Sequence, residues 1–325
     1  MAKTDNVKDF FKSLKRILAF KEVITEETGQ KSPSEFAGLL KNVNKNSFGS
    51  FEKSLICYIP GGIKGVKKIY VNCESTEDES YHNFKSLEEV ILSPILVTLG
   101  EGSFYGCEKL ESVTAGPLLK QVKFNCFYDC KALATLEGFE NVERVGLNSF
   151  YNTAFVNNHL GGPIYIGKVL YEYKGQPTTD EVTIEHDLTF ILDNACASKK
   201  IKELTIKNTS ADNVLNISYN AFNSSYLEKV YIDSRTSLTN GCFNNCPNIK
   251  EVHISHLEQA VTPFPHSDLI TEFYFLNDAG SMPTKIEGFA KFKDKATFYV
   301  KPEAKAAWEK ILVGYNIQSS SENIL

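Results

Sequence analysis

Hydrophobic and polar positions recur along the first half of the chain in steps of 23 residues. Phe104, Phe127 and Phe150 keep this step, and a tyrosine follows each of them. Three aliphatic columns share it: Leu87 to Leu110 to Leu133, Val90 to Val113 to Leu136, and Leu99 to Val122 to Val145. Columns in one register indicate an internal repeat whose units bury their apolar side chains against one another.

A second array with looser spacing follows the first. Its members are Cys196 with Ile201 and Leu204, Phe222 with Leu227 and Val230, and Phe243 with Ile249 and Val252. Each unit holds one short strand pattern, so we expect coils with a parallel sheet on one side and irregular or helical turns on the other. The predicted fold class is an α+β repeat solenoid.

Helical spacing replaces this pattern near the N-terminus. One amphipathic helix is predicted around residues 10–18, and a second begins at Ser32 as N-cap, with Pro33 at the first helical position and Glu35 at the third. The apolar residues that we expect to attach this segment are Phe10, Phe11, Leu14, Leu18, Phe36 and Leu40. Two roles stay open: attachment to a partner, or a cap over the first coil.

The rest of the chain divides into further predicted segments. Gly167-Lys168 separates two alternating apolar runs, which predicts a β-hairpin near residues 163–173 that interrupts or bends the solenoid. Residues 297–300 are expected to form the last strand, Pro302 begins a closing helix that contains Trp308, and residues 319–322 form a frayed tail. The segments are 1–45 (helical attachment or cap), 46–158 (first array), 159–180 (hairpin insert), 181–300 (second array) and 301–325 (C-terminal capping helix and tail).

The repeat motif Ala-Phe-x-x-Cys-x-x-Leu-x-x-Ile resembles the BspA-like type of leucine-rich repeat, and residues 242–252 match it closely. The hairpin segment is similar to an insert in such proteins from gut Bacteroidetes. The resemblance covers residues 56–315 and implies right-handed coils and a surface or secreted binding protein without catalytic activity. Residues 25–43 are similar to modules that precede such repeats in phage structural proteins, which implies attachment to a virion.

Charge and composition exclude several classes of function. The 325 residues include 35 Lys plus Arg and 40 Asp plus Glu, and a net charge of −5 argues against a nucleic-acid partner. Lys12, Lys15 and Arg16 interrupt the most apolar early stretch, so no membrane insertion is expected. Residues 1–9 lack the apolar core of a secretory signal, so we expect another route to the place of action.

Residues capable of chemistry do not form a recognisable site. Cys126 and Cys130, like Cys242 and Cys246, lie in or beside repeat columns at a spacing wider than zinc sites use, so we expect buried, reduced thiols. His253 and His256 fall on opposite faces of a predicted strand. Because no nucleophile, base and orienting residue form a known constellation, we expect no catalysis, no metal and no cofactor.

Outward positions of the predicted strands form two columns that we expect to contact a partner. The first contains Glu89, Ser112, Thr135, Glu203, Lys229 and Glu251. The second contains Ile91, Thr114, Glu137, Thr205, Tyr231 and His253. Within it, Ile91, Tyr231 and His253 combine expected exposure with the large contact area of binding hot spots.

These features favour a non-enzymatic structural or recognition protein. The first hypothesis is a phage virion component, such as a head or tail fibre, anchored by residues 1–45. Its solenoid would bind a protein or glycan on a host surface, or another virion protein, and a fibre role favours a homotrimer. The alternative is a bacterial cell-surface adhesin of the BspA-like type. A third class, a polysaccharide-degrading enzyme, needs a pair of carboxylates across a cleft, which spacing along the sequence does not show.

Overall fold

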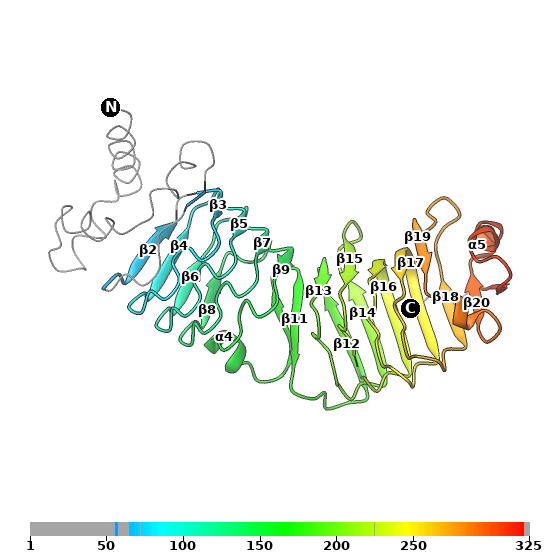
Figure 1. Ribbon diagram of the computed structural model, residues 1–325. Coiled ribbons are helices and arrows are strands. Elements are labelled where there is room, and N and C mark those ends of the chain that lie inside the picture. The colour runs from blue at the N-terminus through cyan, green and yellow to red at the C-terminus, as the bar shows by residue number, and fades with distance from the viewer. Residues whose placement is uncertain (1–55, 58–64, 72, 224, 322–325) are drawn as a thin grey trace. The chain divides into compact units, whose positions relative to one another are not determined.

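The computed structural model describes residues 56–57, 65–71, 73–223 and 225–321 (Figure 1). The chain divides into two compact units, Met1–Asn158 and His159–Leu325, and each is described by itself. The helices predicted within residues 1–45, with the attachment residues from Phe10 to Leu40, lie outside the described residues. Among the described residues, every helix is too short or too polar to cross a bilayer.

The described residues of the first unit form two parallel sheets, and successive coils of this unit add one strand to each. The longer strands pair in the order β2-β4-β6-β8 and the short ones in the order β1-β3-β5-β7-β9 (Figure 1). The longer strands are β2 Lys68–Val71, β4 Glu89–Leu92, β6 Ser112–Thr114 and β8 Thr135–Glu137. The short strands are β1 Ile56–Cys57, β3 Ser75–Thr76, β5 Thr98–Leu99, β7 Gln121–Val122 and β9 Arg144–Val145.

The predicted phenylalanine column forms the spine of the first unit. The rings of Phe104 and Phe127 stack with centroids 5.4 Å apart, and those of Phe127 and Phe150 are 5.2 Å apart. Tyr81 extends the stack by one coil, at 5.1 Å from Phe104. All four side chains are buried, so successive coils share one apolar core, and the repeat solenoid predicted from the sequence is confirmed.

In each of three successive coils, two residues four positions apart have the left-handed backbone conformation, with positive φ. They are Gly102 and Gly106, Asn125 and Asp129, and Asn148 and Asn152 in three successive coils. These residue types adopt positive φ at lower cost than others, because glycine lacks Cβ and the short Asn and Asp side chains bond locally. The coil before them places Glu79 in the left-handed region, with φ 56°.

The prediction of one strand per coil with an irregular or helical return is wrong in the first unit. Leu99, Val122 and Val145 lie in the second row of strands, β5, β7 and β9. The left-handed residues that follow each of these strands interrupt the backbone direction that a helix needs. A short helix, α4 Ala154–Asn157, stands at the end of the unit, and Val156 N donates to Thr153 Oγ1 at its start.

The second unit opens with the predicted β-hairpin, which is confirmed. β10 Gly162–Ile166 and β11 Val169–Lys174 pair antiparallel, with Ile166 opposite Val169. Gly167 has φ 56°, the sign that tight hairpin turns require at their first residue. β11 then pairs in parallel with β13, so the hairpin leads directly into the coils of this unit.

The strands of the second unit belong to one 12-stranded sheet that passes twice along the coils (Figure 1). β16 and β17 pair over both of their halves, with register shifts between, and so contribute to both rows. The strands after the hairpin are β12 Glu181–His186, β13 Phe190–Ile191, β14 Glu203–Asn208, β15 Val214–Ile217, β16 Lys229–Leu238, β17 Glu251–Val261, β18 Glu272–Phe275, β19 Lys285–Glu287, β20 Thr297–Val300 and β21 Asn316–Ser319. One row runs β12-β14-β16-β17-β18-β20-β21, and the other runs β11-β13-β15-β16-β17-β19.

The C-terminal end confirms the closing helix and corrects the last strand. After the 3-10 turn η3 Ala290–Phe292 and β20, the chain forms η4 Pro302–Ala304 and α5 Lys305–Ile311, whose Trp308 is fully buried against Phe275. β21 then pairs in parallel with β20, and Ser320 N donates to Val300 O at 2.8 Å. Residues 319 and 320, expected in a frayed tail, are held in the sheet because Ile317 buries its side chain in the core.

Candidate recognition surface

Half-buried side chains of the first unit alternate with core residues along β2, β4 and β6, and in β8 the exposed Thr135 and Glu137 flank the half-buried Leu136. Backbone register places Glu89, Ser112 and Thr135 side by side, and it aligns Ile91, Thr114 and Glu137 in the same way. All six predicted residues therefore lie in two neighbouring rows on the outer face of one sheet. β2 adds Lys68 and Tyr70 to these rows, and neither was predicted.

The predicted residues of the second unit form two further rows in its own sheet. Register aligns Glu203, Lys229 and Glu251 on β14, β16 and β17, and it aligns Thr205, Tyr231 and His253 in the neighbouring row. Each column predicted from the sequence joins one of these rows to its counterpart from the first unit. In the structure they belong to separate sheets, and the row of the second unit begins at Glu181 and Thr183 on β12.

Aromatic side chains stack along the second row. The ring centroids of Tyr231 and His253 are 4.5 Å apart, those of His253 and Tyr274 are 4.0 Å apart, and those of Tyr274 and Tyr299 are 4.6 Å apart. These separations are near the spacing of paired strands, so each strand contributes one ring to a continuous stack. We call this set the aromatic ladder.

The expected exposure of His253 is wrong. Its side chain lies between the rings of Tyr231 and Tyr274 on the two adjacent strands, and the residue is only 8% exposed. Its Nε2 is 3.6 Å from a carboxylate oxygen of Glu251. His253 therefore stabilises the ladder, and Tyr231, Tyr274 and Tyr299, which are half-buried, present its outer edge.

Charged groups border the aromatic ladder. Lys229 Nζ lies 2.9 Å from Glu251, and this hydrogen bond raises the pKa of the Lys229 ammonium. The Tyr274 hydroxyl donates to Glu272 at 2.7 Å. In the first unit, Lys68 pairs with Glu89 at 2.8 Å, and the pKa of Lys68 is raised for the same reason. Both sheet faces thus combine rings with ordered carboxylates.

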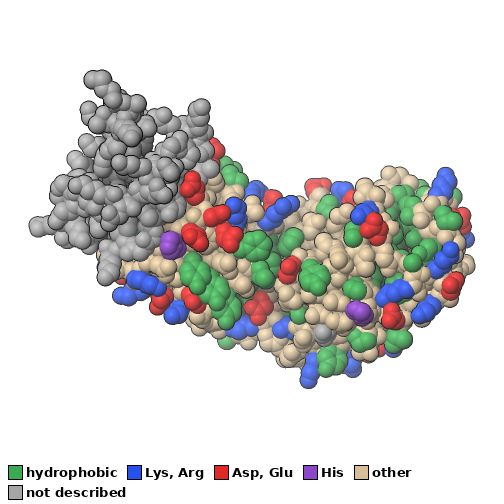
Figure 2. Space-filling model, viewed as in Figure 1, with side chains coloured by type: hydrophobic (Ala, Val, Ile, Leu, Met, Phe, Trp, Pro, Cys, Tyr) green, Lys and Arg blue, Asp and Glu red, His purple; other side chains and the backbone are tan. Residues whose placement is uncertain are grey.

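A second row of rings lies on the turns of the first unit. Tyr105, Tyr128 and Tyr151 stack with centroids 5.1 and 4.8 Å apart, and Tyr151 is 53% exposed. Phe124 on the same turns is also 53% exposed. Figure 2 shows apolar side chains interspersed with charged ones on the face in view. The tyrosine that follows each phenylalanine of the 23-residue repeat is the sequence signal for this row, which was not among the predicted contact residues.

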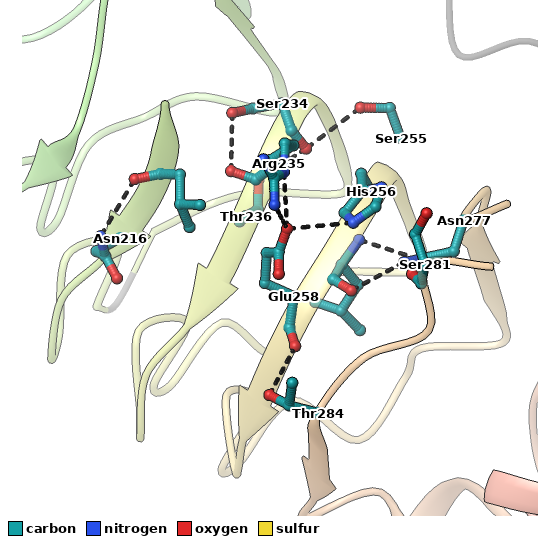
Figure 3. A network of polar contacts seen from close by, with 12 residues as sticks. Asn216, Ser234, Arg235, Thr236, Ser255, His256, Glu258, Asn277, Ser281 and Thr284 are labelled. Atoms are coloured by element: carbon teal, nitrogen blue, oxygen red, sulfur yellow. Dashed lines mark hydrogen bonds and ion pairs between the residues drawn. The ribbon is translucent and has the colours of Figure 1, made fainter. Parts of the chain in front are cut away.

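A polar network occupies the corner where β16 and β17 pass from one row to the other (Figure 3). Arg235 Nη2 lies 2.6 Å from Glu258 Oε1, and His256 Nε2 lies 3.2 Å from the same oxygen. Asn277 is buried beside this corner; its amide donates to Leu257 O and Ser281 O, and its Oδ1 accepts from Leu257 N. The contacts join neighbouring coils, so the network fixes the corner.

The cysteines near the repeat column serve packing. Cys130 Sγ donates to Phe104 O at 3.0 Å, and Cys246 Sγ donates to Phe222 O at 3.0 Å, in each case reaching the preceding coil. Burial raises the pKa of the Cys130 thiol, and it raises that of Cys196 to about 12. The expectation of buried, reduced thiols is confirmed for Cys126, Cys130, Cys242 and Cys246. Among the described residues, no group of three or more His, Cys, Asp or Glu side chains is placed to hold a metal.

Sequence reasoning missed Tyr274 and Tyr299. Both follow the same inward and outward alternation as Tyr231, in Glu272-Phe273-Tyr274-Phe275 and Thr297-Phe298-Tyr299-Val300. The buried Phe273 and Phe298 pair in register, which places the two tyrosines side by side. Continuing the columns beyond residue 253 would have found them.

The family model of the BspA type leucine rich repeat region matches this chain in six copies, over residues 63–174 and 164–279. The chain belongs to this family. The matched residues include the repeats of both units and the hairpin, so the family resemblance noted from the sequence is confirmed.

Several solved structures are similar to this BspA-type protein. The pneumococcal vaccine antigen PcpA is 12% identical, with 78% of this chain and 79% of that chain covered and a TM-score of 0.30. A leucine-rich repeat protein from Bacteroides ovatus is 17% identical, with coverages of 78% and 66% and a TM-score of 0.31. A leucine rich cell surface protein from Faecalibacterium prausnitzii is 12% identical, with coverages of 81% and 91% and a TM-score of 0.26. No curated protein matches the chain.

Proposed function

We propose that this BspA-type protein is a non-enzymatic recognition protein that binds a macromolecular partner along the outer faces of its parallel sheets. The observation that carries the proposal is the aromatic ladder from Tyr231 to Tyr299, with Glu251 and Glu272 beside it. Repeat solenoids use such extended faces for binding, and leucine-rich repeat proteins generally mediate protein–protein interaction.

The chemistry of the ladder supports a protein partner. Tyrosine side chains supply large contact areas at low conformational entropy, and they are enriched in binding hot spots. The rings are held by their neighbours before any partner arrives, because each stacks on the next at 4.0 to 4.6 Å. A face that is ordered in advance loses little freedom when a partner docks.

The test compares binding of the full chain with that of two variants. Tyr274→Ala removes one of the two inner rings of the ladder, whereas Tyr226→Ala removes a tyrosine that is 52% exposed outside the ladder rows. On intact host cells and on arrays of extracellular proteins, we expect Tyr274→Ala to weaken binding about tenfold or more, as loss of a hot spot does. Tyr226→Ala is expected to bind like the original chain.

A substitution in the first unit tests the outer face of its sheet in the same way. Thr114→Arg places a long charged side chain in the outer row of β6, where the native residue is half-buried. Circular dichroism verifies the fold of each variant before binding is compared. Equal binding by the original chain, Tyr274→Ala and Thr114→Arg would contradict the sheet-face proposal.

The place of display is proposed as the bacterial cell surface, which family membership supports. Placement on a phage virion, with anchoring by residues 1–45 and a homotrimeric fibre, stays a prediction from the sequence. Protease treatment and labelling of intact cells test the first, and mass spectrometry of purified particles tests the second. Recovery of the protein only in particles would replace the cell surface by the virion and leave the binding face unchanged.

A further inference from the structure

The aromatic ladder has two different ends. At one end, Tyr231 on β16 is followed by Thr205 on β14 and Thr183 on β12, so the ring stack gives way to small side chains. At the other end, Tyr299 on β20 is followed by Gln318 on β21. Because the rings stack along the row, the face of Tyr231 that is turned away from His253 adjoins Thr205.

The decrease in side-chain size from Tyr231 to Thr205, which we call the step, leaves room for a planar group beside the last ring. Neighbouring strands are about 4.8 Å apart, so a side chain lying over Thr205 takes the place that the next ring of the ladder would have had. A flat group in that place stacks on Tyr231 as His253 does on the opposite side, at 4.5 Å between centroids. The half-buried Thr205 forms the floor of this place.

Carboxylates outnumber cations around the Tyr231 end. Glu181 and Glu203 precede Lys229 in one flanking row, while Glu185, Lys207 and Asp233 are aligned in the other. Lys229 is held at 2.9 Å by Glu251, on the side away from Glu203. At the other end, the flanking row beside Tyr299 contains Thr297 and Asn316, next to Glu272, while Lys301 after Tyr299 pairs with Asp278 at 2.6 Å.

Resting on the proposed recognition role, we propose that the second unit binds an arginine side chain of a protein partner at this step. The guanidinium plane stacks on Tyr231 above Thr205, and its charge faces Glu203. Arginine fits better than lysine because its guanidinium is flat, weakly hydrated and able to stack while its N–H groups bond to a carboxylate. The excess of carboxylates at this end supplies the charge complementarity.

The test uses acetyl-arginine amide as the probe and the full chain labelled with ¹³C at threonine methyl groups. The Thr205 resonance is assigned from Thr205→Ser. We expect the Thr205 methyl to shift with acetyl-arginine amide at millimolar half-saturation, and acetyl-lysine amide, acylated only at its α-amine, to need about three times more. Tyr231→Ala is expected to weaken the response about fivefold, and Glu203→Gln about two- to threefold.

Tyr226→Ala is the matched control, because it removes a tyrosine that is 52% exposed outside the ladder rows, and it is expected to leave the arginine response unchanged. Equal half-saturation for the arginine and lysine probes would overturn the proposal in favour of general charge attraction. A Thr205 shift with maltohexaose but not with acetyl-arginine amide would overturn it in favour of a glycan. No shift with any probe would also overturn it.

These outcomes separate the arginine site from the recognition role. Loss of partner binding in Tyr274→Ala, with no arginine response at Thr205, would refute the site and support the sheet face. An arginine response without any effect of Tyr274→Ala on partner binding would support the site and count against the wider face.

Discussion

Replacement of Asn277 tests how the corner between the two strand rows is held. β18 Glu272–Phe275 ends shortly before Asn277, while β17 continues, so a stretch of β17 loses its neighbour. The Asn277 side chain supplies the hydrogen bonds that a neighbouring strand would make. Its Oδ1 accepts from Leu257 N at 3.0 Å, and its amide donates to Leu257 O at 2.9 Å and Ser281 O at 2.7 Å. Both Asn277 and Leu257 have no exposed surface.

The magnitude follows from the groups that lose their partner. In Asn277→Leu, Leu257 N, Leu257 O and Ser281 O all lose the hydrogen bond that the side chain made. Because an unsatisfied buried backbone group costs about 1–3 kcal/mol, we expect Asn277→Leu to lower the free energy of unfolding by about 3 kcal/mol or more. With a urea dependence of about 1–3 kcal/mol per molar, the unfolding midpoint falls by about 1 M or more.

Asn208 supplies a matched control within the same unit. Its side chain accepts from Leu188 N at 3.0 Å and donates to Leu188 O at 2.7 Å, so it makes the same pair of backbone contacts three coils earlier in the row β14-β16-β17-β18. Asn208 is only half-buried, and water can replace part of its bonding. We expect Asn208→Leu to cost about 1–2 kcal/mol, less than Asn277→Leu.

Asn277→Asp adds a pH dependence of known sign. The new carboxylate faces Leu257 O and Ser281 O, and burial beside carbonyl oxygens raises its pKa in the folded state. A carboxyl whose folded pKa is raised loses stability as pH rises above its unfolded value, near 3.9. Asn277→Asp is therefore expected to be closer to the original stability at pH 4 than at pH 7.

The assay is urea unfolding followed by fluorescence of Trp308, the single tryptophan of the chain, which is buried in the second unit. Circular dichroism follows both units together. A midpoint for Asn277→Leu within about 0.3 M of the original, or a greater loss for Asn208→Leu, would refute the assignment of Asn277 as the residue that closes this corner.

Four further predictions concern the coils of the first unit and the thiols. Gly138→Ala is expected to destabilise the first unit by about 2 kcal/mol or more, because an added Cβ would lie 2.1 Å from Ala115 O and φ is 74°; an unchanged midpoint by circular dichroism would contradict this. Glu79→Asn is expected to raise stability by up to about 1 kcal/mol, since asparagine tolerates the φ of 56° better, and a lower melting temperature would count against the turn argument. Cys130→Ala is expected to lower the free energy of unfolding by about 1–2 kcal/mol and Cys130→Ser by less, because serine preserves a donor to Phe104 O. The buried thiols, with the pKa of Cys196 raised to about 12, should not react with Ellman's reagent at pH 8 until urea unfolds the chain.

Much of this fold follows from the repeat columns in the sequence. Phe104, Phe127 and Phe150 predicted a shared spine because equal spacing in a coil brings the same position to the same place in every turn. The hairpin was predictable because Gly167 lies between two alternating runs. In both cases the controlling physics is local and repeats along the chain.

The second row of strands and the two ends of the ladder were harder to predict. Leu99, Val122 and Val145 formed a visible column, but a two-residue strand has too few positions to show alternation. The burial of His253 depends on Tyr231 and Tyr274, which lie one coil away on either side, and strand-by-strand alternation only assigns it to the outer face. Asn277 carried no signal, because its partners come from the tertiary path of β17.

The central claim is that the outer face of the second unit's sheet contacts the partner. Hydroxyl-radical footprinting of the full chain on intact host cells, read residue by residue by mass spectrometry, tests it directly, because tyrosines lie both on the ladder and on the turns. The account predicts that oxidation of Tyr231, Tyr274 and Tyr299 falls on binding, while that of Tyr226 is unchanged. Protection of the turn tyrosines Tyr105 and Tyr151, with the ladder oxidised as in the unbound chain, would contradict it.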